Sequence, residues 1–137
     1  MKILGAATAA LLLAAAAGGA ASAEGVFDQA EGRWLSEWQT SRGGTHTAKS
    51  TFDEYGRMAS VPDGPWVTFY SADDSGQWEG FWTAKSSPQR CTTAKEGNHH
   101  WGVVRFQFNQ AYDEFAGTWD FCGEGEQWEW RGKRGTW

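Results

Sequence analysis

The sequence predicts an all-β protein, and the most economical arrangement of its segments is an antiparallel up-and-down barrel of about eight strands. The 137 residues include 10 tryptophans, 8 phenylalanines and 18 glycines but only 3 prolines. Aromatic residues favour strands, and glycines that recur every few residues punctuate them. Most of the chain divides into short alternating segments separated by turn residues. A meander of this size closes into a barrel without exposed edge strands, and a two-sheet β-sandwich is the alternative architecture.

The first 23 residues have the pattern of a signal peptide, so residues 24–137 are expected to form a single domain. Lys2 precedes a run rich in alanine and leucine, and Ala21-Ser22-Ala23 is the small-residue pattern at which signal peptidase cleaves. The alanine-rich signal is typical of bacteria. These features predict a secreted or periplasmic protein that has no membrane segment once the signal is removed.

The charge of the chain excludes two classes of partner. Its formal net charge is −5, and it contains no long run of basic residues. Proteins that bind nucleic acid or anionic membranes need clustered lysine and arginine. We therefore expect the partner to be a small molecule, a glycan or a secreted protein. The domain itself is expected to be a monomer.

The first half of the domain contains four expected strands, of which the first is ambiguous. In residues 26–40, aromatic residues such as Trp34 and Trp38 recur at helical spacing, but residues 32–38 alternate as a strand does. Gly32 weakens a helix here, so a strand is preferred. The other expected strands are residues 45–52, 57–61 and 66–70, separated by turns at 53–56 and 62–65.

The second half contains the clearest pattern in the sequence: an aromatic residue, a glycine two positions later, and a large residue two positions after that. The pattern occurs from Trp78 to Trp82, from Phe115 to Trp119 and, in weaker form, from Trp130 to Arg134. Strands are expected at residues 77–83, 101–108, 115–122 and 128–132, with a turn at 123–126 and a long loop at 84–98. Within these strands the aromatic residues and glycines share one face, because successive side chains alternate.

Cys91 and Cys122 are expected to form one disulfide bond. An exported protein folds in an oxidising compartment, and an even number of cysteines favours pairing. The chain has no Cys-x-x-Cys redox motif, so the expected role is structural. The bond would attach the 84–98 loop to the end of strand 115–122.

The repeated Gly-x-Trp and Phe-x-Gly-x-Trp units resemble small secreted bacterial β-barrel domains of uncharacterised function, over about residues 76–134. Streptavidin-like and lipocalin-like barrels are similar in size and in the Gly-x-Trp units that open their strands. The resemblance implies a small closed barrel. No biotin-site pattern matches residue by residue, so the resemblance does not imply biotin binding. Gly80, Gly117 and Gly132 are too irregularly spaced for MORN-type repeats.

Ten tryptophans exceed what the core of so small a domain needs, which predicts that some of them contact a ligand. Flat indole faces stack on sugar rings and on aromatic molecules. The candidate contact residues are Trp78, Trp82, Trp101 and Trp119, with Arg105 as a polar partner. The predicted function is an exported binding module for a glycan or other small organic ligand, with no cofactor, no metal and no catalytic residue.

Two alternative functions use other residues. The acidic loop near Asp73 and the 84–98 loop would suit a protein-interaction module, such as an inhibitor of a secreted or cell-wall enzyme. Glu79 and Asp120 are acidic residues within strands and would serve a small hydrolase, although a structural ion pair is the simpler role for them. The sequence contains no Gly-x-Ser-x-Gly motif and no metal-ligand spacing of its histidines.

Overall fold

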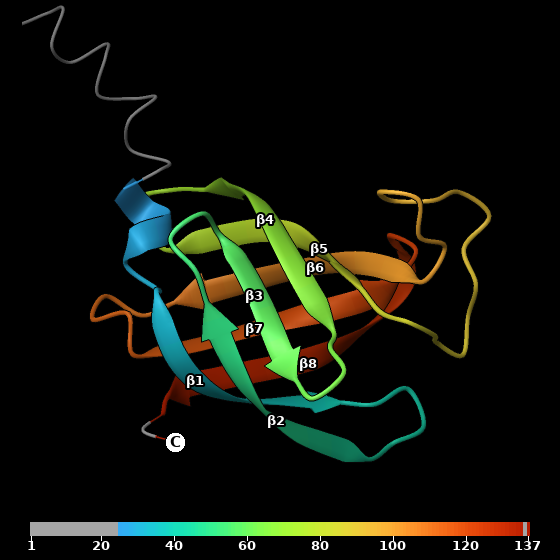
Figure 1. The fold of residues 1–137 in the computed structure, drawn as a ribbon, viewed down its shortest axis with the longest axis horizontal. Helices are drawn as coiled ribbons and strands as arrows, with labels where there is room; N and C mark the ends of the chain where they lie inside the picture. The colour runs from blue at the N-terminus through green and yellow to red at the C-terminus, as the bar shows by residue number, and fades with distance from the viewer. Residues whose placement is uncertain (1–24, 136) are drawn as a thin grey trace, which may run out of the picture.

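The computed structural model describes residues 25–135 and 137, which form a closed antiparallel barrel of eight strands joined in sequence order (Figure 1). The strands are β1 (Gly32–Gln39), β2 (Thr45–Phe52), β3 (Arg57–Val61), β4 (Trp66–Ala72), β5 (Gln77–Thr83), β6 (Trp101–Phe108), β7 (Glu114–Phe121) and β8 (Glu124–Arg134). Strand β1 pairs with β8 and closes the barrel. The predicted barrel is confirmed, and the sandwich alternative is wrong. The predicted signal peptide, residues 1–23, lies outside the described residues.

The ambiguous first segment divides into a short helical turn and a strand. Residues 25–28 are helical, and residues 25–31 together are called the N-terminal turn. Strand β1 begins at Gly32, whose φ of 126° is rare for a residue with a side chain. Trp34 and Trp38 therefore follow strand alternation and face the barrel interior, so the preferred strand is confirmed. No helix in the described part of the chain is long and apolar enough to cross a membrane.

The last hairpin differs from the predicted one. A turn was predicted at residues 123–126, but Cys122 and Gly123 alone join β7 to β8. Both residues have positive φ, 62° and 77°. These values fit a two-residue type I′ turn, whose twist matches that of the flanking strands. Strand β8 consequently begins at Glu124 and has 11 residues.

The meander places alternate connections at opposite ends of the barrel. The closed end comprises the N-terminal turn, residues 25–31, and the connections 53–56, 73–76 and 109–113. The open end comprises the connections 40–44, 62–65, 84–100 and 122–123. In Figure 1 the N-terminal turn lies over one end of the barrel, and the 84–100 loop projects from the other.

Aromatic side chains fill the closed end. They include Trp34, Phe52, Phe69, Trp78, Phe108, Tyr112 and Phe115, all buried. The N-terminal turn covers them, and Trp34 Nε1 donates a hydrogen bond of 2.8 Å to the Ala30 carbonyl oxygen. The Arg134 guanidinium lies over the Trp34 ring, 4.8 Å from its centroid, and donates to three backbone carbonyl oxygens. Packed side chains and paired polar groups thus seal this end.

Three serines form a polar row inside the barrel, between the closed-end aromatic residues and the open end. Ser36, Ser50 and Ser60 lie on neighbouring strands and are each at most 2% exposed. The Ser50 hydroxyl oxygen lies 2.8 Å from each of the other two hydroxyl oxygens. This chain of hydrogen bonds explains how the interior accommodates polar side chains.

Candidate functional site

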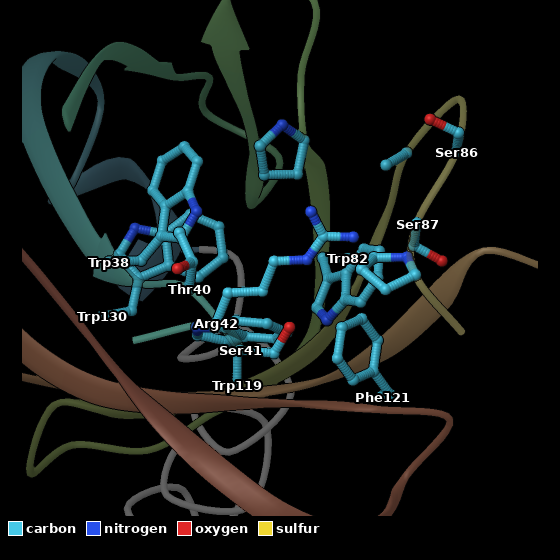
Figure 2. A pocket seen from close by; sticks show the side chains of 13 residues that line it. Trp38, Thr40, Ser41, Arg42, Trp82, Ser86, Ser87, Trp119, Phe121 and Trp130 are labelled. Atoms are coloured by element: carbon cyan, nitrogen blue, oxygen red, sulfur yellow. The ribbon is translucent and has the colours of Figure 1, made fainter. Parts of the chain in front are cut away.

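A cavity of about 560 Å³ lies at the open end of the barrel. Figure 2 shows the side chains around it, which come from several strands and from the open-end loops. Its aromatic wall consists of Trp38, Trp82, Trp119, Phe121 and Trp130. The remaining lining residues are Thr40, Ser41, Arg42, Pro65, Ala84, Ser86, Ser87 and Pro88. Pockets for small organic molecules have volumes of roughly 300–1,000 Å³, so the cavity has a suitable size.

Strand direction brings these indoles together. Odd-numbered strands end at the open end, and even-numbered strands begin there. Trp38, Trp82 and Trp119 lie near the ends of β1, β5 and β7. Trp130 on β8 is directly opposite Trp38 in the β1–β8 pairing. All four face inward, because each occupies an inward position of its strand's alternation.

Glycines in neighbouring strands give the indoles room. A Cβ atom at Gly102 would lie 1.7 Å from the Asp120 carbonyl oxygen and 2.5 Å from Trp82 Nε1. A Cβ atom at Gly117 would lie 2.0 Å from the Arg105 carbonyl oxygen. Any larger residue at either position would collide with a neighbouring strand. The glycines in the inward rows are therefore explained by close packing of strands beside bulky rings.

Hydrogen bonds to the backbone hold two of the four indoles. Trp82 Nε1 donates to the Asp120 carbonyl oxygen at 2.7 Å, and Trp119 Nε1 donates to the Gln39 carbonyl oxygen at 3.0 Å. Trp130 differs, because its Nε1 is buried and has no hydrogen-bond partner among the described residues. An unpaired buried donor costs about 1–3 kcal/mol. The Trp130 N–H is therefore a buried donor that the described protein atoms leave unsatisfied, and it is not exposed to the cavity.

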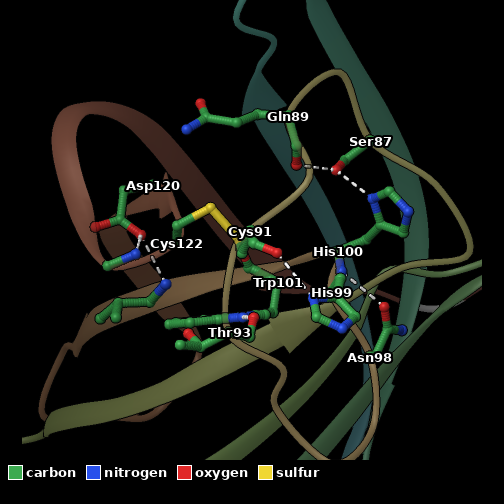
Figure 3. The surroundings of a disulfide bond; sticks show 12 residues. Ser87, Gln89, Cys91, Thr93, Asn98, His99, His100, Trp101, Asp120 and Cys122 are labelled. Carbon is green, nitrogen blue, oxygen red and sulfur yellow. Dashed lines mark hydrogen bonds between the residues drawn. A yellow bond between two sulfur atoms is a disulfide. The ribbon is translucent and has the colours of Figure 1, made fainter.

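A disulfide bond fixes the loop that forms one side of the cavity. Cys91 and Cys122 are joined by an S–S bond of 2.05 Å, which links the 84–100 loop to the β7–β8 turn (Figure 3). The predicted bond is confirmed. The Cys91 backbone N–H also donates to the His99 carbonyl oxygen at 2.8 Å. Covalent and hydrogen bonds therefore hold this loop against the barrel.

The predicted contact residues do not form a single site. Trp82 and Trp119 line the cavity. Trp78 is 1% exposed and lies in the closed-end core. Trp101 faces the outside of the barrel, where the 84–100 loop covers it, and Arg105 lies on the outer face in an ion pair. Ligand contact by Trp82 and Trp119 stays a prediction.

Trp38, Trp130 and Arg42 line the cavity but were not among the predicted contact residues. Strand direction is the sequence signal that could have found Trp38, whereas Trp130 lies in the middle of β8 and reaches the cavity through its pairing with Trp38. Inward residues near the ends of odd-numbered strands and the starts of even-numbered strands meet at one end of a meander. This rule groups Trp38 with Trp82 and places Trp78 at the opposite end.

The acidic residues considered for hydrolysis both have structural partners and do not line the cavity. Glu79 accepts from Arg105 at 2.7 Å and from the Tyr70 hydroxyl at 3.2 Å. Burial raises the pKa of Tyr70, and the Glu79 carboxylate raises it further. Asp120 is 4% exposed, and its Oδ1 accepts from two backbone N–H groups at 2.7 and 3.1 Å. Within the described residues, no cluster of three His, Cys, Asp or Glu side chains could hold a metal ion.

Comparison of the chain with protein-family models, curated proteins and solved structures finds no significant match. The eight-stranded antiparallel barrel is consistent with a lipocalin-like or streptavidin-like architecture. A shared architecture does not by itself assign a function. The open-end cavity is therefore the feature from which a function can be inferred.

Proposed function

We propose that this protein is a binding module that holds a small organic molecule in the open-end cavity. The observation that carries the proposal is the convergence of four indoles on one cavity of about 560 Å³. Indole rings offer flat apolar surface at a low cost in conformational entropy. Trp38 is partly exposed and offers the most accessible indole surface, while Trp82, Trp119 and Trp130 are largely buried behind the cavity surface.

The rigidity of the cavity wall also supports a binding role. The barrel strands, the disulfide bond and the indole hydrogen bonds fix the cavity wall before any ligand arrives. A pre-organised wall loses little conformational entropy on binding, which favours affinity.

Acrylamide quenching of tryptophan fluorescence tests the proposal. The purified protein is titrated with a panel of aromatic, alicyclic and sugar compounds, and we expect one class to protect the cavity indoles from quenching. Trp38→Ala removes a half-buried lining indole and should weaken binding of that class by about tenfold or more.

Trp66→Ala is the matched control. It removes an indole that is 39% exposed on the outer face of β4, near the same end of the barrel. This variant should bind the protecting class with unchanged affinity. If no compound protects an indole, or if both variants weaken binding equally, the cavity is not the ligand site and the proposal is wrong.

A further inference from the structure

The charge at the mouth of the cavity identifies the chemistry that its ligand needs. Among the described residues that line the cavity, only Arg42 is charged. Its side chain is exposed and forms no ion pair within the described residues. Lys85, at the same end, is by contrast paired with Asp63 at 3.3 Å. The mouth therefore carries one positive charge without a neutralising partner.

The other polar side chains of the cavity are hydroxyl groups, and two of these are already engaged. Thr40 Oγ1 accepts from the Gly44 N–H at 3.0 Å. Ser87 Oγ donates to the Gln89 carbonyl oxygen at 2.7 Å and lies 2.9 Å from His100 Nδ1. No carboxylate or amide side chain is among the described lining residues. A buried glycan needs a partner for each of its many hydroxyl groups, so this lining suits a glycan poorly.

We infer that the ligand is a flat, largely apolar carboxylate, whose ring system lies against the indoles while its carboxylate binds Arg42. The inference rests on the proposed binding function and adds the chemical class of the ligand. A guanidinium group presents planar N–H donors that bind a carboxylate in a bidentate manner. The apolar wall and the single cation are thus complementary to the two parts of such a molecule.

The placement of Arg42 also suits a charged group that stays near solvent. Figure 2 shows its side chain extending between the side of the cavity with Trp38 and Trp130 and the side with Trp82. A ligand that enters with its apolar part first leaves its carboxylate at the mouth, where desolvation costs little. The whole chain has a net charge of −5, so a local cation is needed to attract an anion.

Isothermal titration calorimetry with three matched probes tests the inference. The probes are naphthalene carboxylate, its neutral carboxamide and naphthylmethylamine, which share one ring system and differ in charge. We expect the carboxylate to bind about tenfold more tightly than the carboxamide, and the amine to bind most weakly. The carboxylate's advantage should shrink as salt concentration rises.

Three variants locate the charge effect. Arg42→Ala should lower the affinity for the carboxylate to the level of the carboxamide, whose own affinity should not change. Arg42→Lys should keep part of the difference in affinity between the carboxylate and the carboxamide. Arg90→Ala is the matched control, because Arg90 is an exposed arginine of the 84–100 loop that does not line the cavity. This control should bind all three probes as the unaltered protein does.

The possible failures of this inference and of the binding proposal are distinguishable. Equal affinities for the carboxylate and carboxamide, or equal losses of both in Arg42→Ala, overturn the charge inference and leave the binding module standing. If sugars protect the indoles and the naphthalene probes do not bind, the charge inference is likewise overturned and the binding module stands. If no probe binds and no compound of the panel protects an indole, both are overturned.

Discussion

The two ends of the barrel use the same residue type in different ways. At the closed end, Trp34 and Trp78 are at most 1% exposed, and their N–H groups donate to the Ala30 carbonyl oxygen and the Tyr112 hydroxyl. At the open end, Trp38 is only partly buried, although Trp82, Trp119 and Trp130 are 5%, 8% and 2% exposed. Strand alternation points all of these indoles inward. Alternation alone therefore does not distinguish a core residue from a residue that borders a cavity.

The difference lies in what the chain places over each end. Residues 25–31 fold over the closed end, and Arg134 ties this segment to β8 through hydrogen bonds to the carbonyl oxygens of residues 29 and 31. At the open end the 84–100 loop is longer, but the Cys91–Cys122 bond holds it against the β7–β8 turn. It forms one side of the cavity and leaves Trp38 partly exposed, whereas Trp82, Trp119 and Trp130 are buried.

Truncating one indole at each end should give the largest effect and the clearest test of this comparison. Trp34→Ala removes a fully buried ring and should lower the free energy of unfolding by about 3–5 kcal/mol. Trp38→Ala removes a partly buried ring and should cost less than about 2 kcal/mol. Guanidinium chloride unfolding of both variants measures the difference. Equal losses would break the comparison, because Trp38 would then be a core residue as well.

Removing the disulfide bond tests whether it shapes the open end. Replacing Cys91 and Cys122 together with alanine opens a covalent loop that spans 31 positions. The chain-entropy model predicts a loss of about 3–4 kcal/mol in the free energy of unfolding. We also expect weaker binding of naphthalene carboxylate, since the loop that forms one side of the cavity gains freedom to move.

Reduction of the unaltered protein with dithiothreitol is the control, because it breaks the same bond without changing a residue. Denaturant unfolding and calorimetry are measured on both samples. If stability falls but the affinity for the carboxylate does not, hydrogen bonds such as that from Cys91 to His99 are sufficient to position the loop. The disulfide would then stabilise the fold without contributing to the shape of the cavity.

The barrel itself could largely be predicted from the sequence, because alternation and turn residues are local signals. Strands 45–52, 57–61 and 77–83 have the predicted bounds. The β7–β8 turn could not be placed, since Gly123 and Gly125 both suit a turn. Only the pairing of Phe121 with Glu124 selects the two-residue form, and pairing depends on the partner strand.

The candidate site was less predictable, because it depends on which end of the barrel each residue reaches. The aromatic–glycine pattern singled out both Trp78 and Trp82, but only Trp82 lies at the open end. Trp101 is adjacent to the inward-facing Gly102 and consequently faces outward. Strand direction could have separated these residues. No local signal shows that the 84–100 loop leaves the cavity uncovered.

The smallest expected effect is a difference in the free energy of unfolding between variants of two buried indoles. Trp34 and Trp130 are 0% and 2% exposed, so Trp34→Phe and Trp130→Phe lose similar amounts of buried apolar surface. Trp34→Phe also leaves the Ala30 carbonyl oxygen without its donor, whereas Trp130→Phe removes a donor that has no partner in the described chain. We therefore expect Trp34→Phe to cost about 1 kcal/mol more.

Urea unfolding of the two phenylalanine variants, measured side by side, resolves a difference of this size. The change in side-chain volume is identical, and two contacts set Trp34 apart: its hydrogen bond to Ala30 and the Arg134 guanidinium over its ring. If Trp130→Phe costs as much as Trp34→Phe, the Trp130 N–H has a partner in solution, such as a buried water molecule. The Trp130 donor would then be satisfied within the folded protein. If the expected order is observed, the contacts of Trp34 stabilise the closed end, whereas the Trp130 N–H stays without a partner in the folded protein.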